Sequence, residues 1–241
     1  MIAPETQPLT HVYFDFFGTL VDYDPSVLPA ERNAPHEFAV RVGFRAGETE
    51  ANLLWQSAWA ELDDEAHRVG RECTMLQIAG RYAELLAEAD DGVARGSEPD
   101  QGDLERLVAE YLDAWTSGIR IADSASECLT DLARDHTLAV VSNTHDSALV
   151  PRMLRRFGLA GFFADVFTSV DLGWRKPHPE IFRSVLDSHG VAADRAAFVG
   201  DNWVADIEGP RAFGMRTFYV GDPEPGRDPV TLAELPALVR G

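Results

Sequence analysis

The chain has 241 residues, of which 45% are hydrophobic and 25% are charged, and its formal net charge at pH 7 is −19. This apolar content is sufficient to bury one large core, or a core together with a small accessory domain. Such an acidic composition argues against nucleic acids and anionic membranes as partners, because phosphate groups are bound by basic surfaces.

The cysteines and the hydropathy pattern indicate the compartment. The only two cysteines, Cys73 and Cys128, are far apart and lack the spacing of a metal site, so we expect reduced thiols. Residues 1–10 contain neither a basic stretch nor an apolar run, and no later segment reaches the roughly 18 apolar residues of a membrane span. We therefore expect a cytoplasmic protein that is neither secreted nor inserted in a membrane.

The first predicted element is a buried strand within residues 12–20, Val-Tyr-Phe-Asp-Phe-Phe-Gly-Thr-Leu. Its apolar run ends on Asp15 and is broken at Gly18. Open α/β sheets carry out their chemistry at the carboxyl ends of such strands. Burial of an isolated carboxylate costs several kcal/mol unless donors or a cation compensate it. Asp15 could instead cap a turn, but the apolar residues before it favour a functional carboxylate.

A helical region follows this strand. Residues 22–26 are rich in turn formers, and the chain from there to about residue 118 has helical periodicity without a convincing strand. Asp103 is placed to cap the last helix of this region, and residues 88–101 are predicted to form a surface loop. The three apolar stripes at helical spacing lie in residues 51–62, 75–86 and 104–115.

From about residue 121 the pattern alternates between helices and short apolar strands, which is typical of a parallel sheet with right-handed crossovers. The predicted strands are 137–141, 164–170, 196–199 and 216–220. The predicted helices are 124–134, 147–157, 179–189, 206–213 and 231–239. The sequence therefore predicts a three-layer, Rossmann-like α/β core formed by residues 1–21 and 118–241, with an all-α cap domain inserted at residues 22–117.

Four further polar residues follow predicted core strands or the loops near them. Ser142 ends the second core strand, and Asp201 and Asp206 follow a later one. Lys176 is the single lysine among 21 basic side chains, which indicates that a compact ammonium is needed at that position. Asp15, Asp201 and Asp206 would repel one another strongly without a cation, and oxygen ligands suit Mg²⁺.

These motifs, with a helical insert after the first, resemble the haloacid dehalogenase (HAD) superfamily of hydrolases. The resemblance implies that Asp15 is the nucleophile and forms a covalent aspartyl intermediate that water hydrolyses. It also implies that Ser142 donates a hydrogen bond to a substrate oxygen and that Lys176 bridges the nucleophile and the bound anion. Backbone N–H groups of residues 16–18 would form an anion nest. The predicted substrate-binding residues are Phe17, Gly18, Thr19, Asn143, Arg41 and Arg45.

The resemblance further implies a Mg²⁺ site. Its predicted ligands are Asp15, the backbone carbonyl of Phe17, Asp201 and Asp206, with Asp206 either ligating directly or holding metal-bound water. Two of the assignments have simpler alternatives, because Asp206 could be only a helix N-cap and Ser142 could cap a turn.

The position two residues after the nucleophile departs from the phosphatase pattern, which has a second Asp there. That Asp supplies acid–base catalysis worth about 10²- to 10⁴-fold in rate, and Phe17 cannot supply it. Three interpretations follow: a phosphatase with an activated leaving group or another acid, a haloacid dehalogenase, or a catalytically inactive binding or regulatory relative. His145 could be the substitute acid, although the sequence favours the simpler interpretation of an ordinary surface histidine.

Dehalogenases often have an aromatic residue at this position and use a cap arginine for the departing halide. Arg41 or Arg45 could have that role, or both could be ordinary solvated helix residues. Dehalogenases work without metal, however, whereas Asp201 and Asp206 beside Asp15 need a cation. The sequence therefore favours a Mg²⁺-dependent phosphatase acting on a small, anionic, phosphorylated metabolite.

Overall fold

The computed structural model describes residues 7–24, 26, 33–89 and 99–241, and the chain forms two compact units. The core unit contains the chain up to Tyr23, the segment Gly70–Glu72, and Arg120–Gly241; the helical unit contains Asp24–Val69 and Cys73–Ile119. These boundaries differ by two residues from the predicted cap limits of 22 and 117. The structure also assigns three residues from the middle of the predicted cap, Gly70–Glu72, to the core unit.

A five-stranded parallel sheet forms the centre of the core unit, as predicted, with strand order β5-β4-β1-β6-β7. The strands are β1 (His11–Phe14), β4 (Thr137–Ser142), β5 (Asp165–Thr168), β6 (Ala196–Gly200) and β7 (Arg216–Tyr219). In register, Phe14 pairs with Val140 of β4 and with Val199 of β6. The central strand β1 is thus the point where the chain order reverses, and ligands bind at such points in open α/β sheets.

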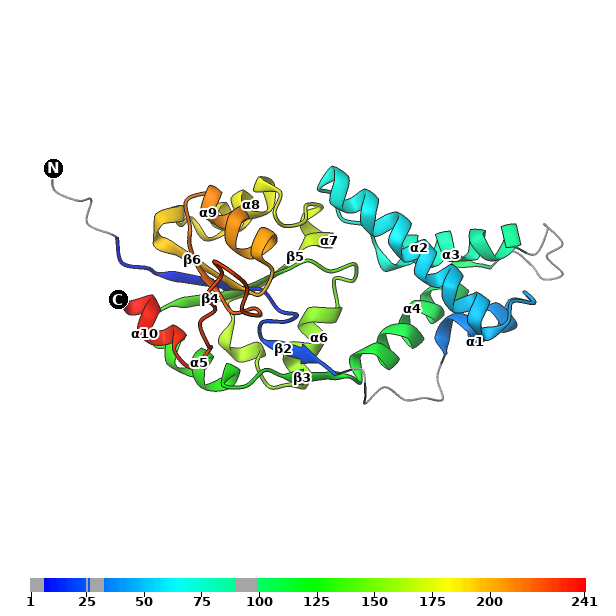
Figure 1. Cartoon of the computed structure of the whole chain (residues 1–241), viewed down its shortest axis with the longest axis horizontal. Coiled ribbons are helices and arrows are strands. Elements are labelled where there is room, and N and C mark those ends of the chain that lie inside the picture. The colour runs from blue at the N-terminus through cyan, green and yellow to red at the C-terminus, as the bar shows by residue number, and fades with distance from the viewer. Residues whose placement is uncertain (1–6, 25, 27–32, 90–98) are drawn as a thin grey trace. The chain divides into compact units, whose positions relative to one another are not determined.

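Helices cover both faces of the sheet, which gives the three-layer α/β fold (Figure 1). Tyr13 faces the side of α8 and packs in one buried cluster with Phe182 and Phe198. Phe14 points to the opposite face and lies edge-on to Phe163. The core helices are α5 (Ala125–Leu132), α6 (Leu149–Arg156), α7 (Ser169–Leu172), α8 (Pro179–His189), α9 (Gly209–Ala212) and α10 (Leu235–Arg240).

Three elements of the core unit differ from the sequence prediction. The helix predicted at 206–213 begins earlier, as a π-helical turn (Trp203–Glu208) followed by the short α9, and the Asn202 side chain caps its start by accepting from the Ala205 N–H. The strand predicted to reach residue 170 ends at Thr168, whose hydroxyl caps α7. A two-stranded ribbon, β2 (Val21–Tyr23) with β3 (Ile119–Ile121), was not predicted.

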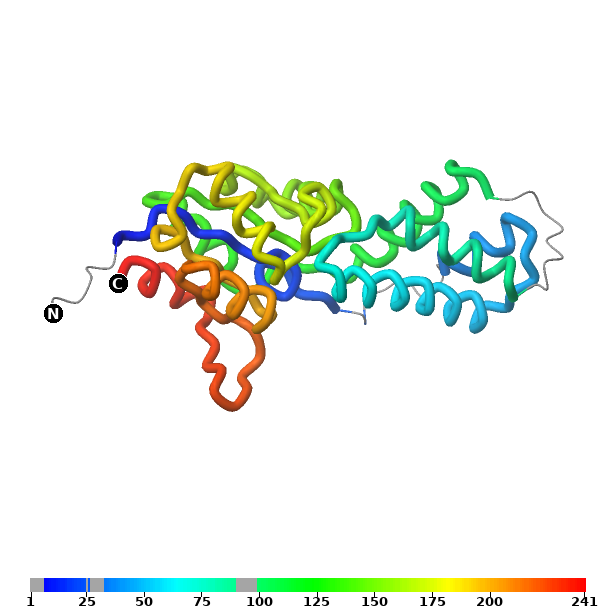
Figure 2. Tube along the Cα trace, turned by 90° about the horizontal axis from the view of Figure 1, so that it is seen from above, coloured from blue at the N-terminus to red at the C-terminus, as the bar shows by residue number. Residues whose placement is uncertain are grey.

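The chain between β7 and α10 loops away from the rest of the core unit (Figure 2). A bridge between Glu224 and Arg227 closes this loop, and the Tyr219 hydroxyl donates to the carbonyl of Asp222 at its base. The Arg227 guanidinium lies 5.0 Å from the ring centroid of Trp203, which fixes the loop against the π-helical turn after β6.

The helical unit consists of α1 (Ala34–Arg41), α2 (Glu48–Val69), α3 (Met75–Ala89) and α4 (Gln101–Thr116). The three predicted apolar stripes lie on α2, α3 and α4, and their buried residues include Trp55, Tyr82 and Leu107. Asp103 does not cap α4. Asp100 does, in a capping box in which Asp103 is the third helical residue. Most of the predicted loop at 88–101 lies outside the described residues.

Candidate active site

Asp15 follows β1 directly, at the carboxyl edge of the sheet. Its residue is 7% exposed, and its backbone N–H donates to the carbonyl of Val199 on β6. The flanking strands β4 and β6 bury the backbone on both sides, because every residue of β1 after His11 is buried. An apolar strand followed directly by Asp thus places one carboxylate at the carboxyl end of the central strand, as the strand pattern predicts.

Lys176 joins two carboxylates. Its Nζ lies 2.7 Å from Asp15 Oδ1 and 2.7 Å from Asp206 Oδ1, and the residue is 2% exposed. Asn143 holds the backbone at this position from both sides: its Nδ2 donates to the Lys176 carbonyl at 3.0 Å, and its Oδ1 accepts from the Lys176 N–H at 2.8 Å. Asn143 therefore positions the lysine, whereas its predicted contact with substrate stays a prediction.

Three carboxylates converge beside this lysine. Each of Asp15, Asp201 and Asp206 offers an oxygen, and the three oxygens lie within 4.8 Å of one another. Two glycines make room for them. A Cβ on Gly18 would lie 2.2 Å from Asp201 Oδ2, and one on Gly200 would lie 2.4 Å from the Asp206 side chain. A side chain at either glycine would therefore displace a carboxylate.

Burial is the largest cause of the pKa shifts of the three carboxylates. Burial raises the pKa of Asp206 to about 6, with Lys176 opposing the shift and the Asp15 charge adding to it. Burial and the neighbouring Asp206 charge raise the pKa of Asp201. Burial also raises the pKa of Asp15 against the opposing effect of Lys176. Burial disfavours the charged form of Lys176, but the charges of Asp15 and Asp206 outweigh it and raise that pKa.

This donor set fits a divalent cation. One ammonium faces three carboxylates, so two negative charges remain when all three are ionised. The donors are oxygens, and Mg²⁺ binds through one or a few carboxylates while it keeps water or phosphate oxygens as its other ligands. The metal site predicted from the sequence is therefore consistent with the arrangement of these side chains.

The turn after Asp15 differs in one respect from the predicted anion nest. The Gly18 N–H donates to the Val21 carbonyl at 2.8 Å within a tight turn, so this amide is already engaged. Gly18 has φ = +79°, which a residue with a side chain rarely adopts. Thr19 is buried and its Oγ1 donates to Asp201 Oδ1 at 3.4 Å, so it supports a predicted metal ligand. The Phe17 ring lies edge-on to that of Phe16, with centroids 4.9 Å apart.

The other predicted substrate residues lie in different settings. Ser142 is fully buried at the end of β4, and its Oγ lies 3.5 Å from the Asn143 carbonyl. In the helical unit, Arg41 Nη1 pairs with Glu110 Oε2 at 3.1 Å, which gives this arginine a partner within its own unit. Arg45 is exposed. Contact of either arginine with a substrate stays a prediction.

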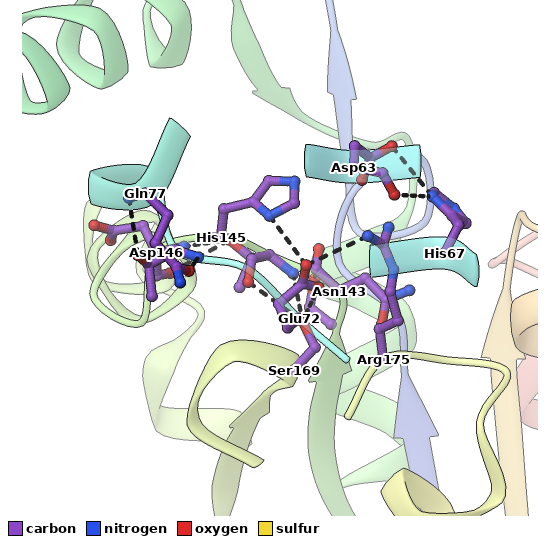
Figure 3. A network of polar contacts seen from close by, with 12 residues as sticks. Asp63, His67, Glu72, Gln77, Asn143, His145, Asp146, Ser169 and Arg175 are labelled. Atoms are coloured by element: carbon purple, nitrogen blue, oxygen red, sulfur yellow. Dashed lines mark hydrogen bonds and ion pairs between the residues drawn. The ribbon is translucent and has the colours of Figure 1, made fainter. Parts of the chain in front are cut away.

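The sequence analysis missed one buried carboxylate of the core unit, Glu72. Its side chain is fully buried, and Figure 3 shows it among Ser169, Arg175 and His145. Ser169 Oγ donates to Glu72 Oε2 at 2.6 Å, while Arg175 Nη1 and His145 Nδ1 lie 3.3 Å and 3.0 Å from Glu72 Oε1. Its local sequence, in the short break between two amphipathic helices, resembles an ordinary solvated loop and gave no signal.

Comparison with known proteins identifies the family. The family model described as haloacid dehalogenase-like hydrolase matches residues 9–214. The chain belongs to this family. It is 30% identical over 205 residues to the putative HAD-hydrolase YfnB of Bacillus subtilis, covering 83% of this chain and 82% of YfnB. The HAD resemblance and the α/β core with its parallel sheet are thus confirmed, and the protein is a hydrolase by family.

The HAD-like relatives include both phosphatases and dehalogenases. The ribulose-1,5-bisphosphate 5-phosphatase of Halopiger xanaduensis is 26% identical over 231 residues, which cover 96% of this chain and 92% of that enzyme. The crystal structure of a 2-haloacid dehalogenase from Pseudomonas syringae superposes with a TM-score of 0.67 at 26% identity, over 96% of this chain and 98% of that one. With some mammalian relatives the match is shorter, and the chain spans less than half of their length.

No helix within the described residues of this HAD-like chain is long and apolar enough to cross a membrane. Cys73 and Cys128 are not joined in a disulfide.

Proposed function

We propose that this HAD-like hydrolase is a Mg²⁺-dependent phosphatase that acts on a small phosphorylated metabolite through an aspartyl-phosphate intermediate. The observation that carries the proposal is the convergence of Asp15, Asp201 and Asp206 around one buried lysine. A dehalogenase has no use for this excess of carboxylates. A phosphatase uses it to hold a cation against an anionic substrate. The phosphatase relative that covers nearly the whole chain supports the same choice.

The residues that would hold the metal are Asp15, Asp201 and Asp206, together with the backbone carbonyl of Phe17 expected from the family pattern. When bound, Mg²⁺ would neutralise phosphate charge and orient the phosphoryl group for in-line attack. The role of Phe17 in this set depends only on its carbonyl, so the aromatic side chain at that position does not remove a ligand.

The nucleophile in this proposal is Asp15, whose free carboxylate oxygen would attack phosphorus and displace the substrate alcohol. Lys176 holds the other oxygen of this carboxylate at 2.7 Å, which fixes its orientation and offsets charge that develops on the phosphoryl oxygens. Ser142, at the neighbouring strand end, would donate a hydrogen bond to one of those oxygens. Water would then hydrolyse the aspartyl phosphate and release inorganic phosphate.

Dehalogenation is the second candidate, and one specific observation favours it. Phe17 replaces a general acid that halide departure does not need, and the chain is similar to a 2-haloacid dehalogenase over nearly its whole length. In that reaction Asp15 would attack carbon and release halide. Arg41 or Arg45 would have to reach the departing anion.

The deciding experiment measures phosphate release from p-nitrophenyl phosphate with and without Mg²⁺, because this leaving group departs without a proton. The proposal requires turnover that depends on Mg²⁺ and is lost in Asp15→Asn. Halide release from 2-haloacids, measured on the same preparations, tests the alternative. Halide release without phosphate release would replace the phosphatase by a dehalogenase, and neither activity would indicate a binding or regulatory protein.

The compartment and the ligand class follow the same proposal. The thiols of Cys73 and Cys128, which are not joined in a disulfide, are compatible with a reducing cytoplasm. The net charge of −19 makes nucleic acid an improbable partner on electrostatic grounds, so the phosphate group is expected on a small molecule.

A further inference from the structure

Contacts within the core unit hold the segment Gly70–Glu72, which lies between α2 and α3 in the chain. The Arg71 guanidinium lies 3.4 Å from the ring centroid of Trp174, and the Arg175 N–H donates to the Gly70 carbonyl at 3.1 Å. Glu72 itself accepts from Ser169 and faces Arg175. The hydrogen bond from His145 is the largest of the effects that oppose burial and lower the pKa of Glu72, so this contact is the main one that keeps the carboxylate ionised.

His145 stands at the catalytic edge of the sheet. It follows β4 by three residues, and β4 pairs in parallel with β1, whose next residue is Asp15. Two residues before His145, Asn143 is hydrogen-bonded to the backbone of Lys176, and the ammonium of Lys176 contacts Asp15. The loop that carries His145 is therefore hydrogen-bonded to the residue that contacts the nucleophile.

The geometry of the pair is that of an oriented imidazole. Glu72 Oε1 contacts His145 through Nδ1 at 3.0 Å, so proton exchange with a substrate would take place at the other ring nitrogen, Nε2. A carboxylate in this position fixes the tautomer of the ring and stabilises its protonated form, as in other acid–base pairs of enzymes. The His145 side chain is 11% exposed, and the Glu72 side chain is 0% exposed, so the contact is shielded from water.

We propose that His145, oriented by Glu72, is the general acid and base of this hydrolase. It would replace the catalytic Asp of the phosphatase pattern, whose position is occupied by Phe17 in this chain. This assignment rests on the proposed phosphatase function. As a carboxylate oxygen of Asp15 bonds to phosphorus, the ester P–O bond breaks and Nε2–H of the imidazolium gives its proton to the leaving oxygen, which departs as the alcohol. The neutral Nε2 then takes a proton from water while the water oxygen attacks phosphorus, the bond to Asp15 breaks, and phosphate is released.

Glu72, Arg175 and the thiol of Cys73 are the ionisable groups of other segments beside the imidazole, and Asp146 follows His145 in its own loop. Burial alone would raise the pKa of Glu72, but hydrogen bonds from His145 and Ser169 and the charge of Arg175 outweigh it and lower that pKa. The Glu72 carboxylate therefore stays ionised at neutral pH, where it favours the protonated imidazole. We expect cleavage of alkyl phosphates to decline as the pH rises and His145 loses its proton.

The test compares leaving groups in His145→Asn, whose amide retains a donor near the Nδ1 position. The parameter is kcat/KM for p-nitrophenyl phosphate and for an alkyl phosphate, because kcat/KM reports the step in which the alcohol leaves. We expect a loss of about 10²- to 10⁴-fold for the alkyl phosphate and a clearly smaller loss for the aryl phosphate. The same substitution at exposed His67 of α2 is the matched control and should change neither value.

An equal loss on both substrates, or no loss on the alkyl phosphate, would overturn the assignment. Failure of the phosphatase function is distinguished from this result by Asp15→Asn: if wild type and Asp15→Asn are equally inactive on the aryl phosphate, the proposed function itself is wrong. Glu72→Gln gives a second readout for Glu72 as a positioning residue, with the alkaline limb of the alkyl phosphate profile moved to lower pH. An unmoved limb in a folded Glu72→Gln protein contradicts the role of Glu72.

Discussion

Two buried charge clusters of the core unit are balanced in opposite ways. Around Asp15, three carboxylates converge, and the ammonium of Lys176 contacts two of them, Asp15 and Asp206. Around Glu72, one carboxylate receives the Arg175 guanidinium, the His145 imidazole and the Ser169 hydroxyl. The first cluster lacks positive charge, whereas the second contains enough of it.

The direction of the pKa shifts follows from this difference. Burial and neighbouring negative charge raise the pKa of Asp206 to about 6, whereas hydrogen bonds and positive charge lower the pKa of Glu72 in spite of its burial. A cluster with excess negative charge is stabilised by a bound cation. A carboxylate whose charge is compensated by its neighbours can orient the groups around it. The comparison therefore separates a predicted metal site from a predicted proton-transfer pair.

Asp15→Asn is expected to have the largest effect. The amide cannot attack phosphorus, so kcat should fall by roughly 10⁴-fold or more, in the range found when a catalytic nucleophile is removed. The substitution also removes one of the crowded negative charges, so the metal-free variant should unfold at a temperature no lower than wild type. Phosphate release and thermal unfolding by circular dichroism check the two statements. Retained turnover in a folded variant would show that another residue is the nucleophile.

Lys176→Ala should have the next largest effect. Loss of the ammonium removes stabilisation of developing phosphoryl charge, and we expect kcat/KM to fall by about 10²- to 10³-fold, or about 2.7 to 4 kcal/mol. It also removes the ammonium that contacts Asp15 and Asp206, so the metal-free protein should be markedly destabilised.

Lys176→Arg is the matched control, because it retains the charge but replaces a compact ammonium by a planar fork. We expect it to recover stability more fully than activity. Kinetics and thermal unfolding of both variants supply the comparison. Full activity in Lys176→Arg would mean that charge alone, and not the position of Nζ between two carboxylates, is what this site needs.

Mg²⁺ should raise the unfolding temperature of the wild-type protein. A ligand present at 100 times its Kd stabilises the folded state by about 2.7 kcal/mol. Because the pKa of Asp206 is raised to about 6, protons compete with the cation below that pH, and the stabilisation should weaken as the pH falls through this value. Differential scanning fluorimetry from pH 8 to pH 5 measures this dependence. Asp201→Asn serves as a variant with reduced affinity, and an equal response to Mg²⁺ in that variant would remove Asp201 from the metal site.

The sequence predicts the first cluster well because each of its carboxylates ends or follows an apolar strand. The strand before Asp15 and the strand before Asp201 are recognisable from their local residues, and a parallel sheet brings their carboxyl ends to one edge. Lys176 is recognisable as the single lysine of the chain. These signals are local, so one sequence was enough to place the group, although the roles of its members stay predictions.

The second cluster could not be predicted in this way. Glu72 lies about 70 residues from His145 and about 100 from Ser169 and Arg175, and only the tertiary fold buries it. The cap of α4 was assigned to Asp103 instead of Asp100, since both aspartates precede the apolar stripe and only backbone geometry distinguishes them. The sequence predicts that the Gly18 amide binds an anion. The hydrogen bond from this amide to the Val21 carbonyl depends on the exact turn, so it could not be predicted from the sequence.

Glu72→Gln should have the smallest effect, on stability and its dependence on pH. The pKa of Glu72 in the folded protein is below its ordinary value of 4.5, so its ionised form contributes stability that is fully present above that value and is lost as the pH falls through the folded pKa. Loss of hydrogen bonds to a charged group should cost about 2 kcal/mol at pH 7. Urea unfolding of wild type and variant should show this difference at pH 7 and its decline toward pH 3. A difference that grows on acidification would mean that Glu72 is held in its protonated form, with a pKa that is raised like that of Asp206. His145 would then have no anionic partner in Glu72.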